Sequence, residues 1–363
     1  MNAKFRLLRS IAGARQRLRD FRWDMGRTLA QKYTRAACDR LPEHKCDGRP
    51  RVTWVLSGDE WVGSARLKGI LIDRHARQTD CGFDSVVAYM PQGWDRCLRW
   101  SPVQWRPFLM RTDVLVIQTR TGATRALLDE CRRQDIAVVL TVSDMEFEEI
   151  PARVTEIADA IVVSSEPLQT AASEFHHNVT LIDDPVEVPD GSIRASDDFG
   201  SQPELVWLGH SNNWPTIEWL KKALDGPEFS RIRIRTVTSH PIATHQWSPV
   251  TVWRDVSHSA IAVIPCKLDD YGRAKSSNRL AAFMAMGYPV ICTPIPSYTR
   301  LIKDGVNGFF ATTAEEWRHC ISTLRDPELR ERVGTAARHT SALDELRIDN
   351  VAARWRSLFE SLR

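Results

Sequence analysis

Short apolar segments and helix-like segments alternate along this chain in two separate series. The first series opens with the apolar run Val52–Leu56 and the helical pattern Ala65–His75, and the second opens with Leu205–Leu208. Alternation on this scale predicts parallel sheets that are covered on both faces. Such alternation is typical of doubly wound α/β domains. The sequence therefore predicts an α/β protein of two Rossmann-like domains that face each other across a cleft.

Further elements continue each series, and a linker rich in Asp, Pro, Ser and Gly separates them. In the first series we expect strands at Ser85–Tyr89, Asp113–Ile117, Ile136–Val142, Ala160–Val163 and Val179–Ile182, with helices at Thr124–Arg133 and Pro167–Phe175. In the second we expect strands at Ile232–Thr238, Ile261–Ile264, Val290–Cys292 and Phe309–Phe310, with helices at Thr216–Leu224, Ser276–Met286 and Ala314–Leu324. The predicted layout is a basic helix (1–36), a linker (37–50), a first domain (51–183), the second linker (184–203), a second domain (204–344) and a closing helix (345–363).

The N-terminal segment carries most of the positive charge of the chain. Residues 1–36 contain ten Lys or Arg against Asp20 and Asp24, a balance of +8, whereas the whole chain has a formal charge of +3. Apolar residues from Leu8 to Tyr33 recur every three or four positions, which predicts an amphipathic helix. Such a helix either docks on its own domain or lies on an anionic membrane surface. We favour the membrane surface, which predicts a protein peripheral to the inner face of the membrane.

Composition excludes several other classes of protein. With 43% hydrophobic and 26% charged residues, the chain is typical of a globular protein. Its eight cysteines lack Cys-x-x-Cys spacing, so no metal site is predicted. No apolar stretch is long enough for a signal peptide or a membrane span, which predicts a cytoplasmic location. Thirteen tryptophans, some beside arginine as in Arg99-Trp100, are interpreted as core or cleft-wall residues rather than as a nucleic-acid site.

The segment from Ile261 to Phe310 carries the candidate chemistry. Its first strand stops at Pro265, a loop follows, and the residues Lys275–Arg279 open a helix that we expect to end at Gly287 in a left-handed conformation. The start of a helix favours anions because its free N–H groups carry partial positive charge, yet Arg273 adds a further cation to this start. A bound phosphate removes the conflict. The sequence therefore predicts a phosphate site here.

Several short motifs follow one another along the same segment. They are Lys275-x-x-Asn278-Arg279, Met284-Ala285-Met286-Gly287-Tyr288-Pro289-Val290-Ile291, Pro296-Ser297-Tyr298 and Leu301-Ile302-x-Asp304-Gly305-x-Asn307-Gly308-Phe309. The series resembles the donor-binding signature of retaining GT-B glycosyltransferases of the family-4 type. The resemblance implies a metal-independent transfer from a nucleotide-diphosphate sugar, without a permanently bound cofactor. It also implies an acceptor domain at 51–183, a donor domain at 204–344 and a closing helix that packs on the first domain.

The chain departs from this family at residues that hold the donor. A Glu-x7-Glu pair of the family corresponds to Ala274 and Ala282, and the Arg and Lys after the first strand of the second domain are replaced by His210–Asn213. Other side chains are therefore expected to bind the donor. The expected set is Gly63, Gly209, His210, Arg273, Lys275, Ser276, Ser277, Asn278 and Arg279. Among them, Lys275 and Arg279 are expected to be catalytic, because they would stabilise the charge of the leaving diphosphate.

The acceptor is expected at the carboxyl ends of the strands of the first domain, where open α/β sheets bind ligands. Three loops qualify there: Ser57–Ser64, Gln118–Arg120 and Ser143–Glu146. In the third loop, Asp144 and Glu146 are candidates for orienting the acceptor hydroxyl or for accepting its proton. Spacing does not choose between the two carboxylates.

With the resemblance, these features predict a glycosyltransferase of cell-surface polysaccharide biosynthesis, whose partners are a nucleotide sugar and a glycan or lipid-linked acceptor. One alternative is a GT-B nucleotide-sugar epimerase, which needs acid and base groups near the sugar. Another is a catalytically inactive GT-B scaffold of a glycan-assembly complex, which Ala274 and Ala282 favour. An NAD-dependent dehydrogenase is disfavoured because no Gly-x-Gly-x-x-Gly follows a predicted strand.

Overall fold

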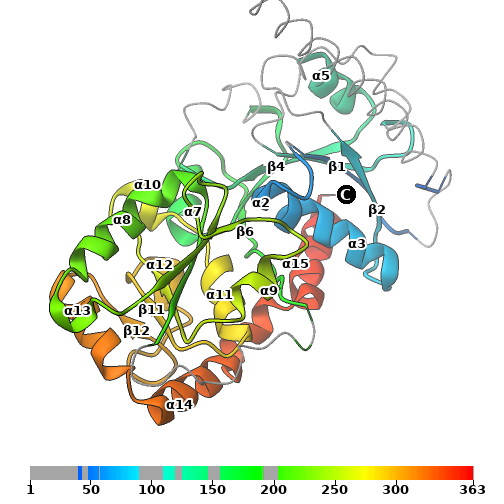
Figure 1. The fold of residues 1–363 in the computed structure, drawn as a ribbon. Helices are drawn as coiled ribbons and strands as arrows, with labels where there is room; N and C mark the ends of the chain where they lie inside the picture. Colours follow the sequence, from blue (N-terminus) through cyan, green and yellow to red (C-terminus); the bar gives the residue numbers. More distant parts are fainter. Residues whose placement is uncertain are drawn as a thin grey trace, which may run out of the picture.

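Two parallel six-stranded sheets organise the chain, one in each of two lobes (Figure 1). The computed structural model describes residues 40–42, 48–56, 58–89, 109–118, 125–145, 156–189, 191 and 203–362. The predicted basic helix at 1–36 and the candidate residue Glu146 lie outside these ranges. Within them, the predicted pair of Rossmann-like domains is confirmed.

The first sheet has the strand order β2-β1-β3-β4-β5-β6, and every neighbouring pair is parallel. Its strands are β1 (Arg51–Leu56), β2 (Asp84–Tyr89), β3 (Val114–Gln118), β4 (Ala137–Val142), β5 (Ala160–Val163) and β6 (Val179–Leu181). The described helices are α2 (Gly63–Ala65), a π-helical turn (Arg66–Ile70), α3 (Leu71–Gln78), α5 (Arg125–Arg133) and α7 (Glu166–Ser173). Strands β1, β3 and β5 are buried at every residue, which explains why their sequences are mostly apolar.

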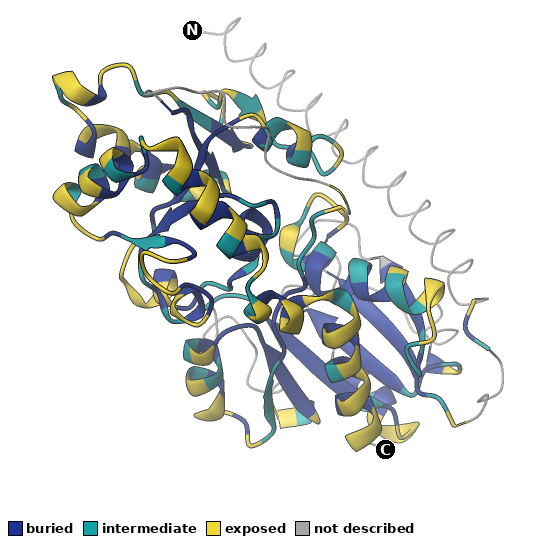
Figure 2. Cartoon of the chain, turned by 90° about the horizontal axis from the view of Figure 1, so that it is seen from below, coloured by how far each residue is buried: buried dark blue, intermediate teal, exposed yellow. Residues whose placement is uncertain are grey.

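The second sheet has the order β12-β11-β10-β7-β8-β9 and is also parallel throughout. Its strands are β7 (Leu205–Leu208), β8 (Ile234–Thr238), β9 (His245–Gln246), β10 (Ile261–Ile264), β11 (Val290–Cys292) and β12 (Phe309–Phe310). The helices are α8 (Trp214–Ala223), α9 (Val252–Val256), α10 (Asp270–Arg273), α11 (Asn278–Ala285), α12 (Pro296–Thr299), α13 (Ala314–Thr323), α14 (Pro327–Arg338) and α15 (Ile348–Ser361). Strands β7, β10 and β11 are buried at every residue, while the helices turn exposed faces to solvent (Figure 2). None of the described helices is long and apolar enough to cross a membrane.

Helix α15 follows the second domain in sequence but packs against the first (Figure 1). Trp355 of this helix lies edge-on to Trp54 of β1, with 4.9 Å between the ring centroids. One turn later, Phe359 lies 5.2 Å from Phe83 by the same measure. The C-terminal helix therefore completes the core of the first domain.

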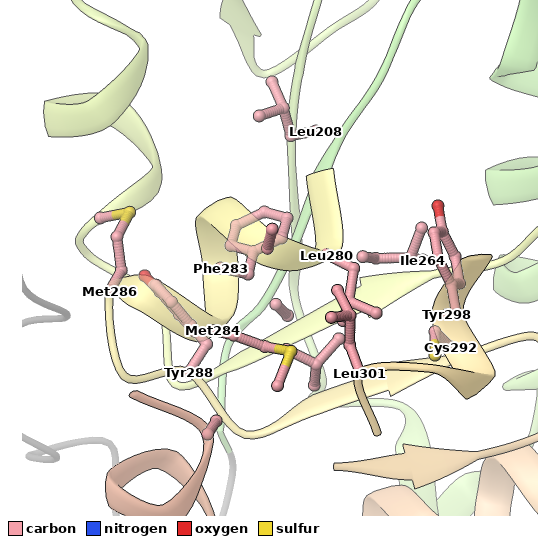
Figure 3. Close-up of a cluster of buried hydrophobic side chains, with 14 of the residues drawn as sticks. Leu208, Ile264, Leu280, Phe283, Met284, Met286, Tyr288, Cys292, Tyr298 and Leu301 are labelled. Atoms are coloured by element: carbon pink, nitrogen blue, oxygen red, sulfur yellow. The ribbon is translucent and has the colours of Figure 1, made fainter. Parts of the chain in front are cut away.

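Helix α11 is anchored in the core of the second domain by its apolar face (Figure 3). Leu280 and Phe283 are fully buried there, and the ring of Phe283 lies edge-on to Tyr288 at 5.3 Å. Gly287 follows the helix with a φ of +79°, as predicted for its left-handed end. This packing fixes the start of α11, where the candidate phosphate site lies.

A capping box at the start of α13 gives a pH-dependent contribution to stability. Thr313 Oγ1 accepts a hydrogen bond from the backbone N–H of Glu316, whose carboxylate accepts from the N–H groups of Thr312 and Thr313. These two N–H groups lower the pKa of Glu316. A carboxylate with a lowered pKa stabilises the fold above its ordinary value of about 4.3, and this stabilisation is lost as the pH falls through the folded value.

We therefore expect Glu316→Gln to lower the stability at pH 7 and to have little effect in acid. Urea unfolding at pH 7 and at about pH 3, below the ordinary pKa of Glu, measures this difference. Glu315→Gln, one residue earlier and without such bonds, is the control. An equal loss for Glu316→Gln at both pH values contradicts the expectation.

Candidate active site at the domain boundary

The loop between β10 and α11 is held in one shape by local contacts. Asp269 Oδ1 accepts a hydrogen bond from the backbone N–H of Gly272 at 2.8 Å and so begins α10. A side chain at Gly272 would place its Cβ 2.0 Å from the carbonyl oxygen of Lys267, so only glycine fits. The shape of the loop places Ala274 and Lys275 at the boundary with the first domain.

Hydrogen bonds fix the backbone at Ala274 and Lys275. The hydroxyl of Ser165, at the end of β5 in the first domain, donates to the carbonyl oxygen of Ala274 at 2.7 Å. Ser297 of α12 donates to the carbonyl oxygen of Lys275, also at 2.7 Å. Both main-chain positions are therefore held, one of them from the opposite domain.

The side chain of Lys275 points to the candidate carboxylate of the first domain. Its Nζ lies 2.6 Å from Asp144 Oδ1 and 3.5 Å from the ring centroid of Tyr271. Both members of the ion pair are partly exposed, at 19% for Lys275 and 27% for Asp144. A donor-side candidate and an acceptor-side candidate, 131 residues apart in sequence, therefore meet in the fold.

A series of buried polar contacts lies beside this ion pair. Lys68 Nζ donates to the carbonyl oxygen of Val142 at 3.1 Å and lies 4.0 Å from Asp184 Oδ1. Asp184 Oδ2 accepts a hydrogen bond from Ser276 at 2.7 Å. Burial lowers the pKa of Lys68 against the attraction of Asp184, and burial raises the pKa of Asp184 against the attraction of Lys68. These contacts join the first domain, the linker and the candidate donor loop.

The start of α11 holds two polar side chains that make no hydrogen bond within the described part of the chain. Ser277 is 1% exposed, and its hydroxyl has no partner there. Asn278 likewise has none, and no acidic residue lies in the first turn. Because the first N–H groups of a helix attract anions, this end is suited to a phosphate that also reaches Ser277 and Asn278.

The two arginines predicted to flank the phosphate take different positions. Arg279 donates to the carbonyl oxygen of Leu208 at 3.3 Å, and its second nitrogen lies 3.9 Å from Cys266 Sγ. Arg273 is exposed and donates to the carbonyl oxygen of Leu268 at 3.0 Å. Arg279 therefore joins the ends of β7 and β10, whereas Arg273 stays at the surface.

The remaining donor candidates lie in two loops. Gly209 follows β7, and a Cβ there would lie 2.5 Å from the indole of Trp207. His210 comes next, and its ring accepts a hydrogen bond from the N–H of Asn212 at 3.2 Å. These two positions adjoin the carbonyl group that Arg279 contacts. Gly63 lies in the other domain, exposed at the start of α2.

The alanines at the positions of the family's Glu pair are both buried. Ala274 is 1% exposed and belongs to the hydrophobic cluster of the first domain, and Ala282 of α11 is 3% exposed. A carboxylate at Ala274 would lie among apolar side chains, which is costly for a charge. This position therefore serves contact between the domains. Asp144 of the first domain and Asp184 of the linker bring carboxylates to the loop from other segments.

The sequence offered weak signals for Lys68, Asp184 and Ser165, which were not among the predicted site residues. Lys68 interrupts the run Leu67–Ile70, which is otherwise apolar and buried at every position. Asp184 and Ser165 follow β6 and β5 at their carboxyl ends, where open sheets collect ligands. Polar residues at such positions often have only a structural role, so these residues are identified from the fold and not from the sequence.

Comparison with solved structures identifies the arrangement of the two domains. HepE of Anabaena, solved with UDP and glucose, matches 86% of this chain and 100% of its own at 12% identity and a TM-score of 0.60. Sucrose-phosphate synthase of Thermosynechococcus elongatus matches 86% and 99% at 11% identity and a TM-score of 0.58. The lipopolysaccharide outer core galactosyltransferase WaaB matches 86% and 99% at 9% identity and a TM-score of 0.54. The chain has the GT-B fold.

Sequence comparison assigns no family to the chain. No protein-family model matches the chain, and no curated protein matches it. At 9–12% identity the likeness to HepE, sucrose-phosphate synthase and WaaB concerns the fold. The residues of the boundary must therefore carry any argument about chemistry.

Proposed function

We propose that this protein is a glycosyltransferase that moves a sugar from a nucleotide-diphosphate sugar to a glycan or a lipid-linked acceptor. The observation that carries the proposal is the meeting of Lys275 with Asp144 beside the start of α11. A cation and a helix start on one domain suit a diphosphate, and a carboxylate on the other suits a hydroxyl. The GT-B fold and the binding of UDP and glucose by HepE support this assignment.

The start of α11 is the proposed site of the donor diphosphate. Lys275 and Ser277 precede the helix, Asn278 begins it, and Arg279 in the same turn adds a second cation. Ser165 and Ser297 hold the backbone before the helix, so these groups are placed to stabilise the charge that develops on the leaving diphosphate. Gly209 and His210 would bound the same site from the end of β7, as the resemblance implies.

Asp144 is the proposed acceptor of the proton. Its carboxylate pairs with Lys275 in the structure. When the donor phosphates take Lys275, this carboxylate becomes available to the acceptor hydroxyl. The bond from the anomeric carbon to the diphosphate then breaks, the acceptor oxygen bonds to that carbon, and the hydroxyl proton passes to Asp144. Retention of configuration and independence of metal ions come from the family resemblance and are part of the proposal.

Nucleoside-diphosphate binding by a Lys275→Ala variant tests the donor site. A hydrogen bond to a charged group contributes about 1.5–3 kcal/mol, so the affinity for UDP should fall roughly 10- to 150-fold. Titration calorimetry measures the change, after a thermal-shift panel of nucleoside diphosphates has chosen the base. Lys267→Ala, in the same loop with an exposed side chain, is the control. Undiminished affinity in Lys275→Ala would remove the proposed donor site.

Product analysis separates the proposed transferase from its alternatives. A nucleotide-sugar epimerase converts the sugar nucleotide without any acceptor, whereas a transferase releases the nucleoside diphosphate and extends a glycan. A scaffold binds no nucleotide or nucleotide sugar, an outcome that the buried Ala274 and Ala282 would then explain. A new sugar nucleotide formed in the absence of acceptor would contradict the transferase assignment.

Contact with an anionic membrane is proposed for residues 1–36 on the strength of their sequence alone. Each basic residue near an anionic surface contributes about 1 kcal/mol, and the segment has a balance of +8 from ten basic and two acidic residues. We expect the full chain to float with phosphatidylglycerol vesicles and a chain that begins at residue 37 to stay behind. Phosphatidylcholine vesicles are the control. Equal flotation of both chains rules out this role.

A further inference from the structure

Trp61 is a large aromatic side chain that remains exposed beside the domain boundary. It lies in the loop between β1 and α2, at the carboxyl end of β1, and is 57% exposed. Its ring lies edge-on to Trp247 of the second domain, with 5.7 Å between the centroids and 74° between the planes. An exposed indole at the ligand-binding edge of a sheet is a candidate contact surface.

Trp247, which contacts Trp61, is itself supported by neighbouring side chains. The guanidinium of Arg66 lies over the ring of Trp247 at 5.0 Å. Arg66 itself pairs with Glu187 of the linker and donates to the carbonyl oxygen of Glu60 at 2.7 Å. Trp247, supported by Arg66, therefore contacts one edge of Trp61 and leaves more than half of its surface exposed. An aromatic surface that is ordered before binding binds at a low entropic cost.

Two carboxylates flank the indole. Asp59 Oδ1 accepts a hydrogen bond from the N–H of Trp61 at 3.0 Å, and Asp59 is exposed. Glu60 pairs with Arg74 at 2.6 Å and is also exposed. An apolar aromatic face with hydrogen-bond acceptors at its edge matches a pyranose ring, which has C–H groups on its faces and hydroxyl groups around its rim.

We propose that Trp61 is the platform on which a pyranose ring of the acceptor glycan stacks, with Asp59 and Glu60 accepting hydrogen bonds from its hydroxyl groups. This inference rests on the proposed glycosyltransferase function and adds a subsite to its acceptor side. A hydrocarbon chain fits the surface less well, because it would displace water from both carboxylates without replacing its hydrogen bonds. A nucleobase also stacks on indole, so the test must distinguish loss of the glycan from loss of the nucleotide.

A printed array of defined oligosaccharides, probed with the full chain in the presence of UDP, tests the subsite. The proteins compared are the wild type, Trp61→Ala and the control Trp219→Ala, whose tryptophan is 42% exposed on α8. We expect the wild type and Trp219→Ala to bind the same glycans. Trp61→Ala should bind them at least about tenfold more weakly, as for a tryptophan that dominates a contact, with unchanged affinity for UDP.

Three results would overturn the platform. They are equal glycan binding by Trp61→Ala, a parallel loss of UDP affinity in that variant, and an array on which the UDP-bound wild type captures no glycan. The proposed function has its own failure, since a wild type that binds no nucleoside diphosphate would refute it whatever Trp61 does. With an array-positive glycan as acceptor, Trp61→Ala should raise the KM for the glycan and leave the KM for the nucleotide sugar unchanged.

Discussion

Replacement of Trp355 by alanine is expected to destabilise the first domain by about 3–5 kcal/mol, the usual cost of removing a large buried aromatic side chain. Trp355 is 2% exposed and lies between Trp54 and Phe359, at centroid distances of 4.9 and 5.6 Å. Edge-to-face packing with Trp54 would be lost together with the buried area. The remaining cavity could close only by moving α15 or β1.

The same change should loosen the link between the domains. Arg354, the neighbour of Trp355 in α15, lies 3.3 Å from Asp183 Oδ2, and Asp183 also pairs at 2.5 Å with Arg300, the residue that follows α12. A displaced α15 would therefore release Arg354, one of the two arginines that pair with Asp183 at the end of the first domain.

Urea unfolding followed by circular dichroism measures the loss in Trp355→Ala, with Trp219→Ala as an exposed-tryptophan control. An unfolding midpoint equal to that of the wild type would show that α15 does not complete the core of the first domain. Two transitions in place of one would show that the domains unfold separately in the variant.

Most strands could be predicted because burial on both faces leaves a mostly apolar run. Predicted Val52–Leu56 and observed Arg51–Leu56 differ by one residue, and Leu205–Leu208 is observed as predicted. Strand β9 was missed because two residues, His245 and Gln246, show no period. Helix α14 was missed although Asp326 caps it and Pro327 begins it, which are ordinary start signals for a helix.

The candidate site could be predicted on one domain but not across the boundary. The loop before α11 predicts a phosphate site because Lys275 and Arg279 place positive charge at a helix start, which already carries partial positive charge. This signal is local in the sequence. The partners of the loop come from distant segments: Asp144, Ser165 and Asp184 lie between 92 and 131 residues away. No spacing rule connects such residues, because the orientation of the two domains decides which loops meet.

The buried alanines and the ion pair give one explanation for the departure from the family signature. Ala274 contacts the cluster of the first domain, so the loop packs closely against that domain. Close packing brings Asp144 within 2.6 Å of Lys275. A carboxylate is thus supplied from the opposite domain, which favours an active enzyme over a scaffold. This explanation makes the role of Asp144 the most informative point to test.

Asp144→Asn is expected to reduce the rate of sugar transfer by about 10²–10⁴-fold, the usual contribution of a positioned general base. Asparagine keeps the size of the side chain but cannot accept the proton from the acceptor hydroxyl. The affinity for UDP should stay the same or increase, because the neutral amide no longer competes with the phosphates for Lys275. The variant therefore separates the catalytic role of Asp144 from a structural one.

Steady-state kinetics and calorimetry on the same preparations provide the measurement. We expect kcat to fall in Asp144→Asn with little change in the KM for the nucleotide sugar, which is the pattern of an interaction made in the transition state. Asp225→Asn, exposed in the turn after α8, controls for the loss of one negative charge. If UDP affinity and kcat fall together, Asp144 serves to position Lys275. If kcat is unchanged, the proton passes to another group, and Glu146 in the same loop is the next carboxylate to replace.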